Sequence, residues 1–556
     1  MKKHTYMLVR RRMVIMKTTR WLNEEEFREL LKISDYVGYR EGEGGVFEFN
    51  PSKALRNNYS YEDICALIKE LDLHVDEKDL DRIKQILWST SIRVDWDSLT
   101  GSVKVTIPWI IFEKFKPILR ELKGVFHSKN NESITYRILP FNTKEFIDKT
   151  RAMNIAINDP LKLFEDKPLP LNVELKNIVL RDYQVEALNK WVENNYQGII
   201  ALPTGSGKTV IAIASLTKKP VRTLIVVYTK EQMLQWRDSI IKYTNIEPRL
   251  IGLIYSEEKR LAPITITTYQ SGFRAINEIS PYFTMLIVDE VHHLPAEKFK
   301  HIVQHSLAKY KLGLSATPVR EDNKHVELFP LMGGIIYYKT PAELVEKGYL
   351  AKYRVVTIKV KLTREEWMKL LELRRNYRKL IGSKNFEEVV EEAKRGDARA
   401  AEALKIHSEM RMLLAKAKAK IEAAVKIAKL EFEKGSKIII FTQFVDQARE
   451  ISRILDAYLI TGETDTDDRK KALVNFKNNP RGILVVTTVG DEGLDIPDAN
   501  VGIIVSGTGS RRQFIQRLGR LLRPKKDGSE AVLYEIVLEK TPEEYQAMRR
   551  KRGFFQ

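Results

Sequence analysis

The chain has 556 residues, with 93 lysines and arginines against 74 acidic residues and a formal net charge of +19. A chain of this length holds three or four domains. The positive surplus indicates a polyanionic partner, with solubility or thermal ion pairing as the alternative explanation. The one cysteine, Cys65, excludes an intramolecular disulfide and a four-cysteine iron–sulfur cluster. We therefore expect a protein of the reducing cytoplasm, and the lack of a long apolar run predicts no membrane span.

The N-terminal part is expected to form a basic tail over residues 1–20 and a small mixed α+β domain over residues 21–155. Apolar residues alternate on either side of Leu99-Thr100-Gly101, which predicts a β-hairpin. Segments 27–51 and 115–140 are similar to each other, because each reads as a helix, a glycine-containing turn and a strand. The sequence is compatible with a true duplication and with chance similarity.

From residue 180 onward, apolar strand-like runs alternate with helical stretches. Such alternation is typical of a parallel sheet covered by helices, here of RecA type. The runs fall into two groups, which predict a first lobe over residues 156–340 and a second lobe over residues 341–556. The expected strands are 198–202, 223–227, 264–267, 285–288 and 311–315 in the first lobe, and 437–442, 482–487, 501–506 and 531–537 in the second.

A glycine-rich loop, residues 202–209, follows the first of these strands and reads Leu-Pro-Thr-Gly-Ser-Gly-Lys-Thr. Its glycines allow backbone N–H groups to approach phosphates that a side chain would block. Lys208 can place its ammonium against the β- and γ-phosphates, and the Thr209 hydroxyl can hold Mg²⁺. The usual first glycine or alanine is replaced by a leucine. The nucleotide-binding set expected in this loop is Thr204, Gly205, Ser206, Gly207, Lys208 and Thr209.

Two acids follow the apolar strand 285–288. Asp289 is placed to complete the Mg²⁺ shell, and Glu290 is placed to orient or polarise the attacking water. The loop and the acids together predict a protein that binds a nucleoside triphosphate with Mg²⁺ and hydrolyses it. The next residues include His292 and His293, which resemble a metal pair, but a zinc site needs further ligands and the single cysteine is distant in sequence.

Residues 363–433 are almost entirely helix-forming, with Gly382 and Gly396 as the expected breaks. The stretch carries a basic cluster made of Arg374, Arg375 and Arg378. Such charge runs are by default a solvated helical surface. Because the stretch is inserted between two lobes, contact with nucleic-acid phosphates is the alternative.

Four further motifs complete the pattern. Arg181 and Gln184 precede the glycine-rich loop and suit an adenine edge, because a side-chain amide donates and accepts at once. Residues 313–318 read Gly-Leu-Ser-Ala-Thr-Pro and lead into the triplet Arg320-Glu321-Asp322. Two more motifs lie far downstream, at 487–497 and 516–523. In this order, with the loop and the acids, they resemble the superfamily 2 helicases over residues 180–540.

Within that superfamily the chain most closely resembles the XPB family. The acids are followed by Val-His-His, as in XPB, and the Arg320-Glu321-Asp322 triplet follows the Ala-Thr-Pro motif after one residue. A basic helical insertion at about residues 364–420 lies where XPB proteins have their thumb. The small N-terminal domain lies where XPB proteins have a DNA damage-recognition domain.

The resemblance implies roles for residues that composition and spacing leave unassigned. Arg520 and Arg523 would be arginine fingers that reach the γ-phosphate from the second lobe, and Gln516 would contribute to nucleotide binding. The Arg320-Glu321-Asp322 triplet would act with the thumb in duplex opening, and His292 would couple the nucleotide to DNA-contacting motifs. Solvated arginines on a basic helix and a local ion-pair network are the respective alternatives for the fingers and the triplet. The resemblance also implies ATP and Mg²⁺ as cofactors and, as in archaeal XPB relatives, a companion nuclease.

We expect a monomeric, ATP-dependent DNA translocase and helicase of 3′–5′ polarity that acts on forked or single-stranded DNA in repair or transcription. The motor of a restriction or recombination system and an RNA helicase are the alternatives within the superfamily. An ATP-gated scaffold that grips DNA, recruits a nuclease and unwinds poorly is the alternative from another class. The sequence leaves open the preferred DNA structure and whether the strands separate during translocation.

Overall fold

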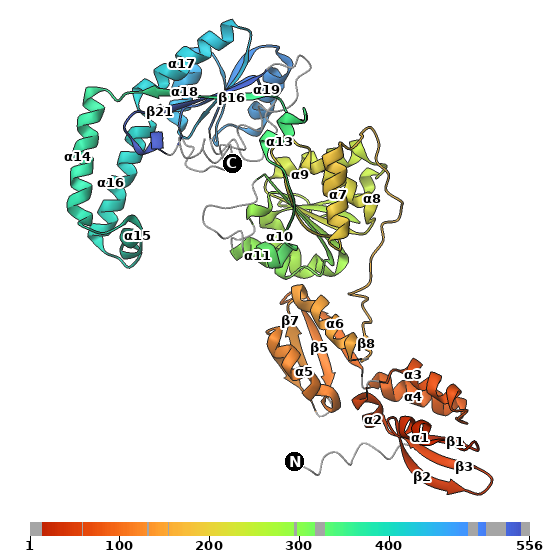
Figure 1. Cartoon of the computed structure of the whole chain (residues 1–556). Helices are drawn as coiled ribbons and strands as arrows, with labels where there is room; N and C mark the ends of the chain where they lie inside the picture. The colour runs from red at the N-terminus through yellow and green to blue at the C-terminus, as the bar shows by residue number, and fades with distance from the viewer. Residues whose placement is uncertain are drawn as a thin grey trace.

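The structure is a computed structural model that describes residues 14–547, apart from residues 58, 90, 131–132, 154, 294–296, 317–327, 488–498, 507–529 and 546. A small N-terminal α+β domain is followed by two lobes, each built on a parallel sheet, and a helical thumb is inserted into the second lobe (Figure 1). The predicted fold class, two RecA-like lobes with a thumb and a small N-terminal α+β domain, is confirmed.

The first N-terminal sheet has three antiparallel strands in the order β1-β3-β2. Strand β1 lies inside the segment that was predicted to be a basic tail, so the prediction is wrong for these residues. Met16 on this strand is fully buried, because β1 pairs with a strand that follows it in the chain. The elements of this part are β1 (Ile15–Thr18), α1 (Glu24–Leu30), β2 (Ser34–Arg40), β3 (Gly44–Phe49), α2 (Pro51–Arg56), α3 (Tyr61–Glu70) and α4 (Glu77–Ser89).

A second N-terminal sheet follows, with the strand order β6-β7-β5-β4-β8. The predicted hairpin is present as the antiparallel pair β4 and β5, which meet at the turn before Ser102. The elements are β4 (Ile92–Asp97), β5 (Ser102–Pro108), α5 (Trp109–Glu121), β6 (Val125–Lys129), β7 (Ser133–Ile138), η1 (Pro140–Asn142), α6 (Thr143–Ala152) and β8 (Ile157–Asn158).

The two N-terminal sheets repeat one topology. In each, a strand, a helix and a hairpin follow one another, and the third strand lies between the first and the second: β1-β3-β2 in one sheet and β5-β7-β6 in the other. Each hairpin also has a register shift, between Tyr36 and Gly38 in one and between Phe126 and Ser128 in the other. These shared features favour duplication over chance similarity.

The first lobe has a seven-stranded sheet in the order β11-β12-β10-β13-β14-β9-β15, and every pair in it is parallel. Its central strands are buried runs of Ile, Leu and Val, which suit a sheet covered on both faces. Helices α7, α8 and α9 pack on one face, and α10 and α11 pack on the other. The strands are β9 (Gln197–Ala201), β10 (Thr223–Val227), β11 (Ile251–Ile254), β12 (Ile264–Thr268), β13 (Met285–Val288), β14 (Tyr310–Ser315) and β15 (Ile335–Tyr338). The helices are α7 (Asp182–Glu193), α8 (Lys208–Lys218), α9 (Lys230–Tyr243), η2 (Pro248–Leu250), α10 (Tyr269–Ile279), η3 (Ser280–Tyr282), η4 (Val291–His293), α11 (Glu297–Gln304) and α12 (Leu328–Met332).

The second lobe has a six-stranded parallel sheet in the order β16-β21-β20-β17-β19-β18. Helices α17 and α18 pack on one face of this sheet, and α19 contributes Phe476 to the core on the other face. Helix α13 (Pro341–Glu346) and the segment after it connect the two lobes. The elements are β16 (Tyr353–Val360), α17 (Lys418–Glu433), β17 (Lys437–Thr442), α18 (Val445–Leu455), β18 (Tyr458–Ile460), α19 (Thr466–Asn478), β19 (Gly482–Thr487), β20 (Val501–Ile504) and β21 (Ala531–Leu538).

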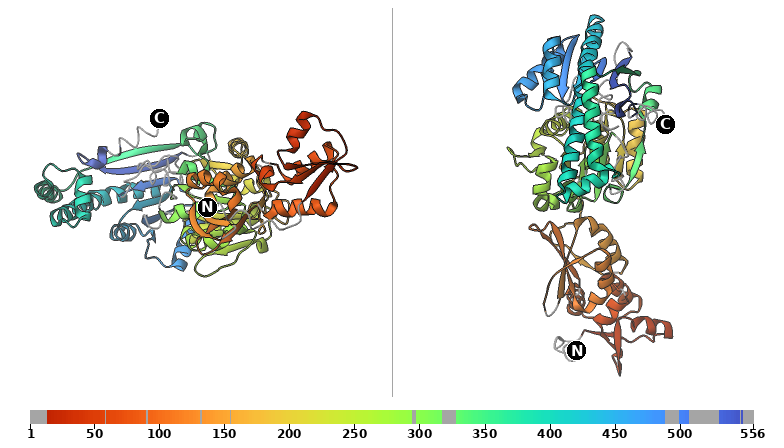
Figure 2. Two further views of the ribbon diagram at one scale, coloured as in Figure 1. Left: turned by 90° about the horizontal axis from the view of Figure 1, so that it is seen from below. Right: turned by 90° about the vertical axis from the view of Figure 1, so that its left-hand side faces the viewer.

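The thumb is made of α14 (Arg364–Ile381), α15 (Phe386–Lys394) and α16 (Ala398–Ala415). It extends away from the sheet of the second lobe (Figures 1 and 2). Thr363 and Glu366 form a capping box that begins α14, and Gly382 ends it with a φ of 59°. Gly396, with a φ of 91°, separates α15 from α16. Both predicted helix breaks are therefore confirmed.

Candidate functional site

The site lies at one edge of the first sheet, where three neighbouring strands end. Strands β13, β14 and β9 are adjacent and parallel, so their carboxyl ends meet. The glycine-rich loop follows β9, the acids Asp289 and Glu290 follow β13, and Ser315 is the last residue of β14. This strand order brings together two motifs that are far apart in sequence, at the usual ligand-binding edge of a parallel sheet.

The glycine-rich loop has the backbone conformation that its glycines predict. Gly205 and Gly207 have φ values of 84° and 80°, in the left-handed region that other residues rarely adopt. A Cβ atom at Gly207 would lie 2.6 Å from the side-chain nitrogen of Gln184. The left-handed φ favours glycine at this position, and any larger residue would also displace the Gln184 amide.

Lys208 begins helix α8, and its ammonium is turned toward the loop itself. Nζ donates to the carbonyl oxygens of Leu202 at 2.9 Å and Pro203 at 3.3 Å. Burial lowers the pKa of Lys208, against the opposing effect of the neighbouring acids Glu290 and Asp289. A bound anion would favour the charged ammonium of Lys208, which burial alone disfavours.

Three hydroxyl-bearing residues of the loop fit a phosphate and metal site. The side-chain oxygens of Thr204 and Ser206 are buried and make no hydrogen bond to any described residue. Unpartnered buried hydroxyls are costly unless a ligand uses them. Thr209, half-buried in the first turn of α8, is the third. These groups, with the helix N-terminus, are suited to an anion and to the magnesium ion that accompanies nucleotide phosphates.

In this structure, the polar groups of Arg181 and Gln184 make hydrogen bonds within the protein. The amide of Gln184 donates to the carbonyl oxygen of Ser206 at 3.1 Å and accepts from the backbone N–H of Arg181 at 2.9 Å. Tyr183 donates to the same Ser206 oxygen at 2.5 Å. Arg181 donates to the carbonyl oxygen of Tyr349, on the segment that leads to the second lobe, at 3.0 Å. Contact with an adenine edge stays a prediction for both side chains.

Both oxygens of the Asp289 carboxylate are held. Oδ1 accepts from the backbone N–H of Glu290, and Oδ2 accepts from Nε1 of Trp236, each at 2.9 Å. Asp289 is 8% exposed. Burial raises its pKa, although the Trp236 hydrogen bond and Lys208 act in the opposite direction. A cation at this position would favour the ionised carboxylate.

Glu290 is held in a strained backbone conformation beside its partner groups. Its φ of 49° lies in the left-handed region, which costs a residue with a side chain some free energy. The Tyr269 hydroxyl donates to the carbonyl oxygens of Asp289 at 3.0 Å and of Glu290 at 3.3 Å, which braces this turn. Nδ1 of His292 lies 3.3 Å from the carboxylate of Glu290 and 3.3 Å from the Ser315 hydroxyl.

The two histidines after the acids make different contacts. His292 is 1% exposed and joins the acid turn to the end of β14. His293 stacks on Tyr228, with ring centroids 4.2 Å apart and an angle of 7° between the planes. Among the described residues, no group of three or more histidines, cysteines or acids could hold a metal ion.

Several predicted residues cannot be placed. The Arg320-Glu321-Asp322 triplet, Gln516, Arg520 and Arg523 lie outside the described residues. The basic cluster of the thumb is described: Arg375 and Arg378 on α14 are exposed and Arg374 is half-buried. None of the three forms an ion pair with a described residue, so their charge is available to a ligand.

Sequence reasoning missed Trp236 and Tyr269. Both contact the acid turn, but they reach it from α9 and α10, and no motif marks them. The only signal in the sequence is a tryptophan in the middle of one helix and a tyrosine at the start of another, each helix following a strand of this sheet.

Comparison with known proteins identifies the family. Residues 177–320 match the family described as the Type III restriction enzyme res subunit, and residues 398–555 match the ERCC3/RAD25/XPB C-terminal helicase family. The chain is 38% identical over 456 residues to the DNA 3′-5′ translocase XPB2 of Sulfurisphaera tokodaii, which covers 78% of this chain and 99% of that protein. The chain belongs to the XPB family.

More distant XPB relatives are longer proteins. The DNA 3′-5′ helicase XPB of Kineococcus radiotolerans is 31% identical over 383 residues, which cover 67% of this chain and 62% of that protein. The transcription and DNA repair factor IIH subunit XPB of Schizosaccharomyces pombe is 30% identical over 404 residues, covering 68% of this chain and 46% of that protein. The chain thus spans less than two thirds of the length of these two relatives.

The XPB family match at residues 398–555 spans α16 of the thumb and most of the second lobe. None of the described helices is long and apolar enough to cross a membrane.

Proposed function

We propose that this XPB-family chain is an ATP-dependent 3′–5′ DNA translocase and helicase that opens or remodels DNA in repair or transcription. The arrangement of Lys208, Asp289 and Glu290 at one sheet edge carries the proposal, because phosphoryl transfer needs those groups together. Its relatives, named a DNA 3′-5′ translocase and a DNA 3′-5′ helicase, supply the polymer and the polarity.

ATP would be held by the loop and cleaved with the help of the acids. Lys208 would leave the loop carbonyls and pair with the β- and γ-phosphates. Thr209 and Asp289 would hold Mg²⁺, which neutralises charge on the phosphate oxygens. Glu290 would orient the attacking water, and the unpartnered hydroxyls of Thr204 and Ser206 support a ligand in the loop.

The second lobe would complete the site. Arg520 and Arg523 would stabilise the charge of the transition state, and Gln516 would contact the nucleotide. Arg523→Ala should then lose most turnover yet bind ATP nearly as well as the wild type, since such groups act mainly in the transition state. A large rise in the ATP dissociation constant at an unchanged maximal rate would contradict this role.

Movement along DNA would follow from alternating closure of the lobes, because bound ATP bridges them and hydrolysis removes the bridge. The exposed arginines of the thumb are suited to phosphate contact. The Arg320-Glu321-Asp322 triplet would act at the splayed junction. Its triple alanine variant should keep DNA-stimulated ATPase but unwind forked DNA poorly. A joint loss of ATPase, unwinding and melting temperature would make the triplet structural.

The motor would work as a monomer in the cytoplasm, with a companion nuclease as partner. The single cysteine fits a reducing compartment. The test of partner and activity is strand displacement on forked DNA, with and without proteins that co-purify with the chain. DNA should stimulate ATP turnover more than RNA does, and a 3′ single-stranded tail should be required. Equal stimulation by RNA, or a requirement for a 5′ tail, would overturn the proposal.

A further inference from the structure

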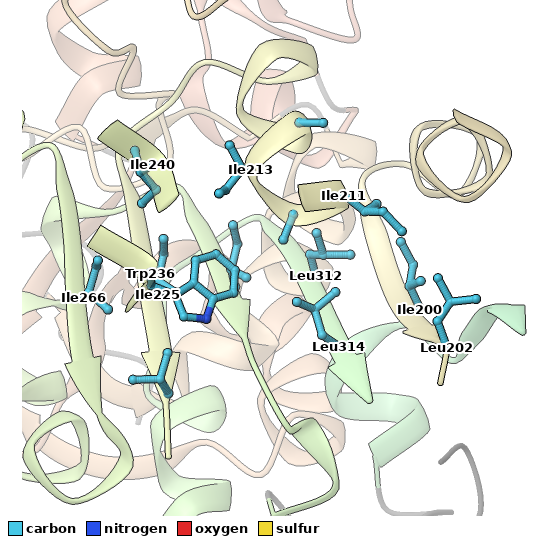
Figure 3. Close-up of a cluster of buried hydrophobic side chains, with 14 of the residues drawn as sticks. Ile200, Leu202, Ile211, Ile213, Ile225, Trp236, Ile240, Ile266, Leu312 and Leu314 are labelled. Carbon is cyan, nitrogen blue, oxygen red and sulfur yellow. The ribbon is translucent and has the colours of Figure 1, made fainter. Parts of the chain in front are cut away.

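Trp236 touches the proposed catalytic site from inside the core of the first lobe. It lies on α9, is 3% exposed, and packs in the buried cluster that contains Ile225, Ile240 and Ile266 (Figure 3). Only one atom of its ring is polar. That atom, Nε1, donates to Oδ2 of Asp289 at 2.9 Å.

The hydrogen bond from Trp236 fixes the orientation of the Asp289 carboxylate, which the backbone contact alone does not fix. The N–H of Glu290 holds Oδ1 of Asp289 at 2.9 Å, and a single donor allows the carboxylate plane to turn about that contact. A second donor on Oδ2 fixes the plane, while each oxygen keeps a lone pair for another partner. An indole N–H has no acceptor capacity and does not titrate near neutral pH. It can therefore orient the carboxylate without competing for a metal ion.

We propose that Trp236 is a positioning residue for the magnesium-binding carboxylate of Asp289. The inference rests on the proposed role of Asp289 in ATP hydrolysis and adds a residue that holds this ligand. Groups that hydrogen-bond to metal ligands are known to set ligand orientation, and their loss typically lowers metal affinity by about 10- to 100-fold. Trp236 acts through Asp289 and makes no contact with the nucleotide in this account.

A purely structural role must be separated from this one, because a buried tryptophan also fills the core. The chain offers a matched control in Trp191. Its ring is fully buried in the same core cluster, and its Nε1 donates at 2.9 Å to the carbonyl oxygen of Lys311, away from the acids. Trp191→Phe and Trp236→Phe each remove one buried N–H donor and a similar ring volume. Only the second removes a donor from Asp289.

The experiment compares these two variants with the wild type in a binding assay. The probe is a fluorescent, non-hydrolysable ATP analogue, and its affinity is measured over a range of Mg²⁺ concentrations and in EDTA. Trp236→Phe should raise by about tenfold the Mg²⁺ concentration that gives half of the Mg²⁺-dependent increase in affinity for the analogue. Its affinity in EDTA should equal that of the wild type, and at high Mg²⁺ its affinity should return close to the wild-type value. Trp191→Phe should follow the wild-type curve. Steady-state ATPase should show the same rise in Mg²⁺ requirement, with a maximal rate that recovers.

Two further variants keep the outcome decisive. In Trp236→His, ring nitrogen Nε2 can take the place of the indole Nε1, so this variant should recover part of the Mg²⁺ response although it fills less of the core. If Trp236→Phe behaves like Trp191→Phe while Asp289→Asn loses Mg²⁺-dependent binding, the positioning role is wrong and the metal site stands. If Asp289→Asn keeps Mg²⁺-dependent binding, the proposed metal site itself fails.

Discussion

Nδ1 of His292 lies 3.3 Å from Oε2 of Glu290, and the same nitrogen lies 3.3 Å from Oγ of Ser315. One buried ring thus touches the proposed water-orienting acid and the end of β14. The chain continues from Ser315 toward the Arg320-Glu321-Asp322 triplet. A change at the γ-phosphate that moved Glu290 would therefore reach this segment through His292.

We expect His292→Ala to lower DNA stimulation of ATPase more than it lowers basal turnover. The ring is the contact between the two segments, and mutations along such contacts change coupling by about 0.5–2 kcal/mol, or about 2- to 30-fold. ATP turnover with and without saturating DNA measures the ratio. His293→Phe is the control, because it keeps a ring stacked on Tyr228. An equal loss in both conditions would show that His292 serves the chemistry alone.

Lys208→Ala should lower ATP turnover by about 100-fold or more while leaving DNA binding largely intact, because the phosphate site and the DNA surface are separate. Glu290→Gln should bind ATP without hydrolysing it, since a neutral amide cannot orient and polarise the attacking water as the carboxylate would. Radiolabelled ATP binding and phosphate release distinguish the two variants. Near-normal turnover in either would remove its residue from the site.

Neutralising Arg374, Arg375 and Arg378 should weaken DNA binding and reduce the slope of log affinity against log salt. Each phosphate contact on a single strand contributes about 0.7 to that slope, so the loss should be about two. Substituting glutamine for the exposed lysines 176, 190 and 242 of the first lobe removes the same charge and is the control. If both triple variants give the same slope, the thumb has no special contact with phosphates.

Acid should loosen the contact between the N-terminal domain and the first lobe. His301 and His305 stack there with centroids 3.8 Å apart, and His305 donates to the carbonyl oxygen of Gly101 at 2.7 Å. Burial and the neighbouring His305 lower the pKa of His301 to about 4, from about 6.5 in the unfolded chain. The unfolded chain therefore binds more protons below pH 6.5, and stability falls as the pH drops from about 6.5 to about 4.

Calorimetric melting at pH 7 and pH 5 measures this effect. His301→Gln should lose less stability between the two pH values than the wild type does. His74→Gln, at an exposed histidine of the N-terminal domain, is the control. An identical pH response in all three proteins would place the pH dependence elsewhere in the chain.

The parts of the fold that could be predicted are those set by local pattern. The strands 223–227, 285–288, 437–442 and 482–487 have the predicted bounds, because each is a short apolar run buried on both faces. Four strands of the lobes were missed: β11, β15, β16 and β18. All four are edge strands, and β18 has only three residues, so pairing with a single neighbouring strand decides them more than residue type does.

Non-local contacts account for the other misses. Strand β1 was predicted as a tail because four residues in a basic stretch give no strand pattern until β3 is in place beside them. At the site, the loop and the acids were recognised from residue type and spacing. Trp236 and Tyr269 were not recognised, since their contact with the acid turn depends on where α9 and α10 place the indole N–H and the phenol O–H.

ATP-driven movement along DNA is the central claim, and displacement of a third strand from a DNA triplex tests it most directly, because it needs translocation without strand separation. The wild-type chain should release the third strand only with ATP and Mg²⁺, on substrates that require 3′–5′ movement, and Glu290→Gln should release none. ATP turnover by the wild type without displacement in either direction would contradict the account.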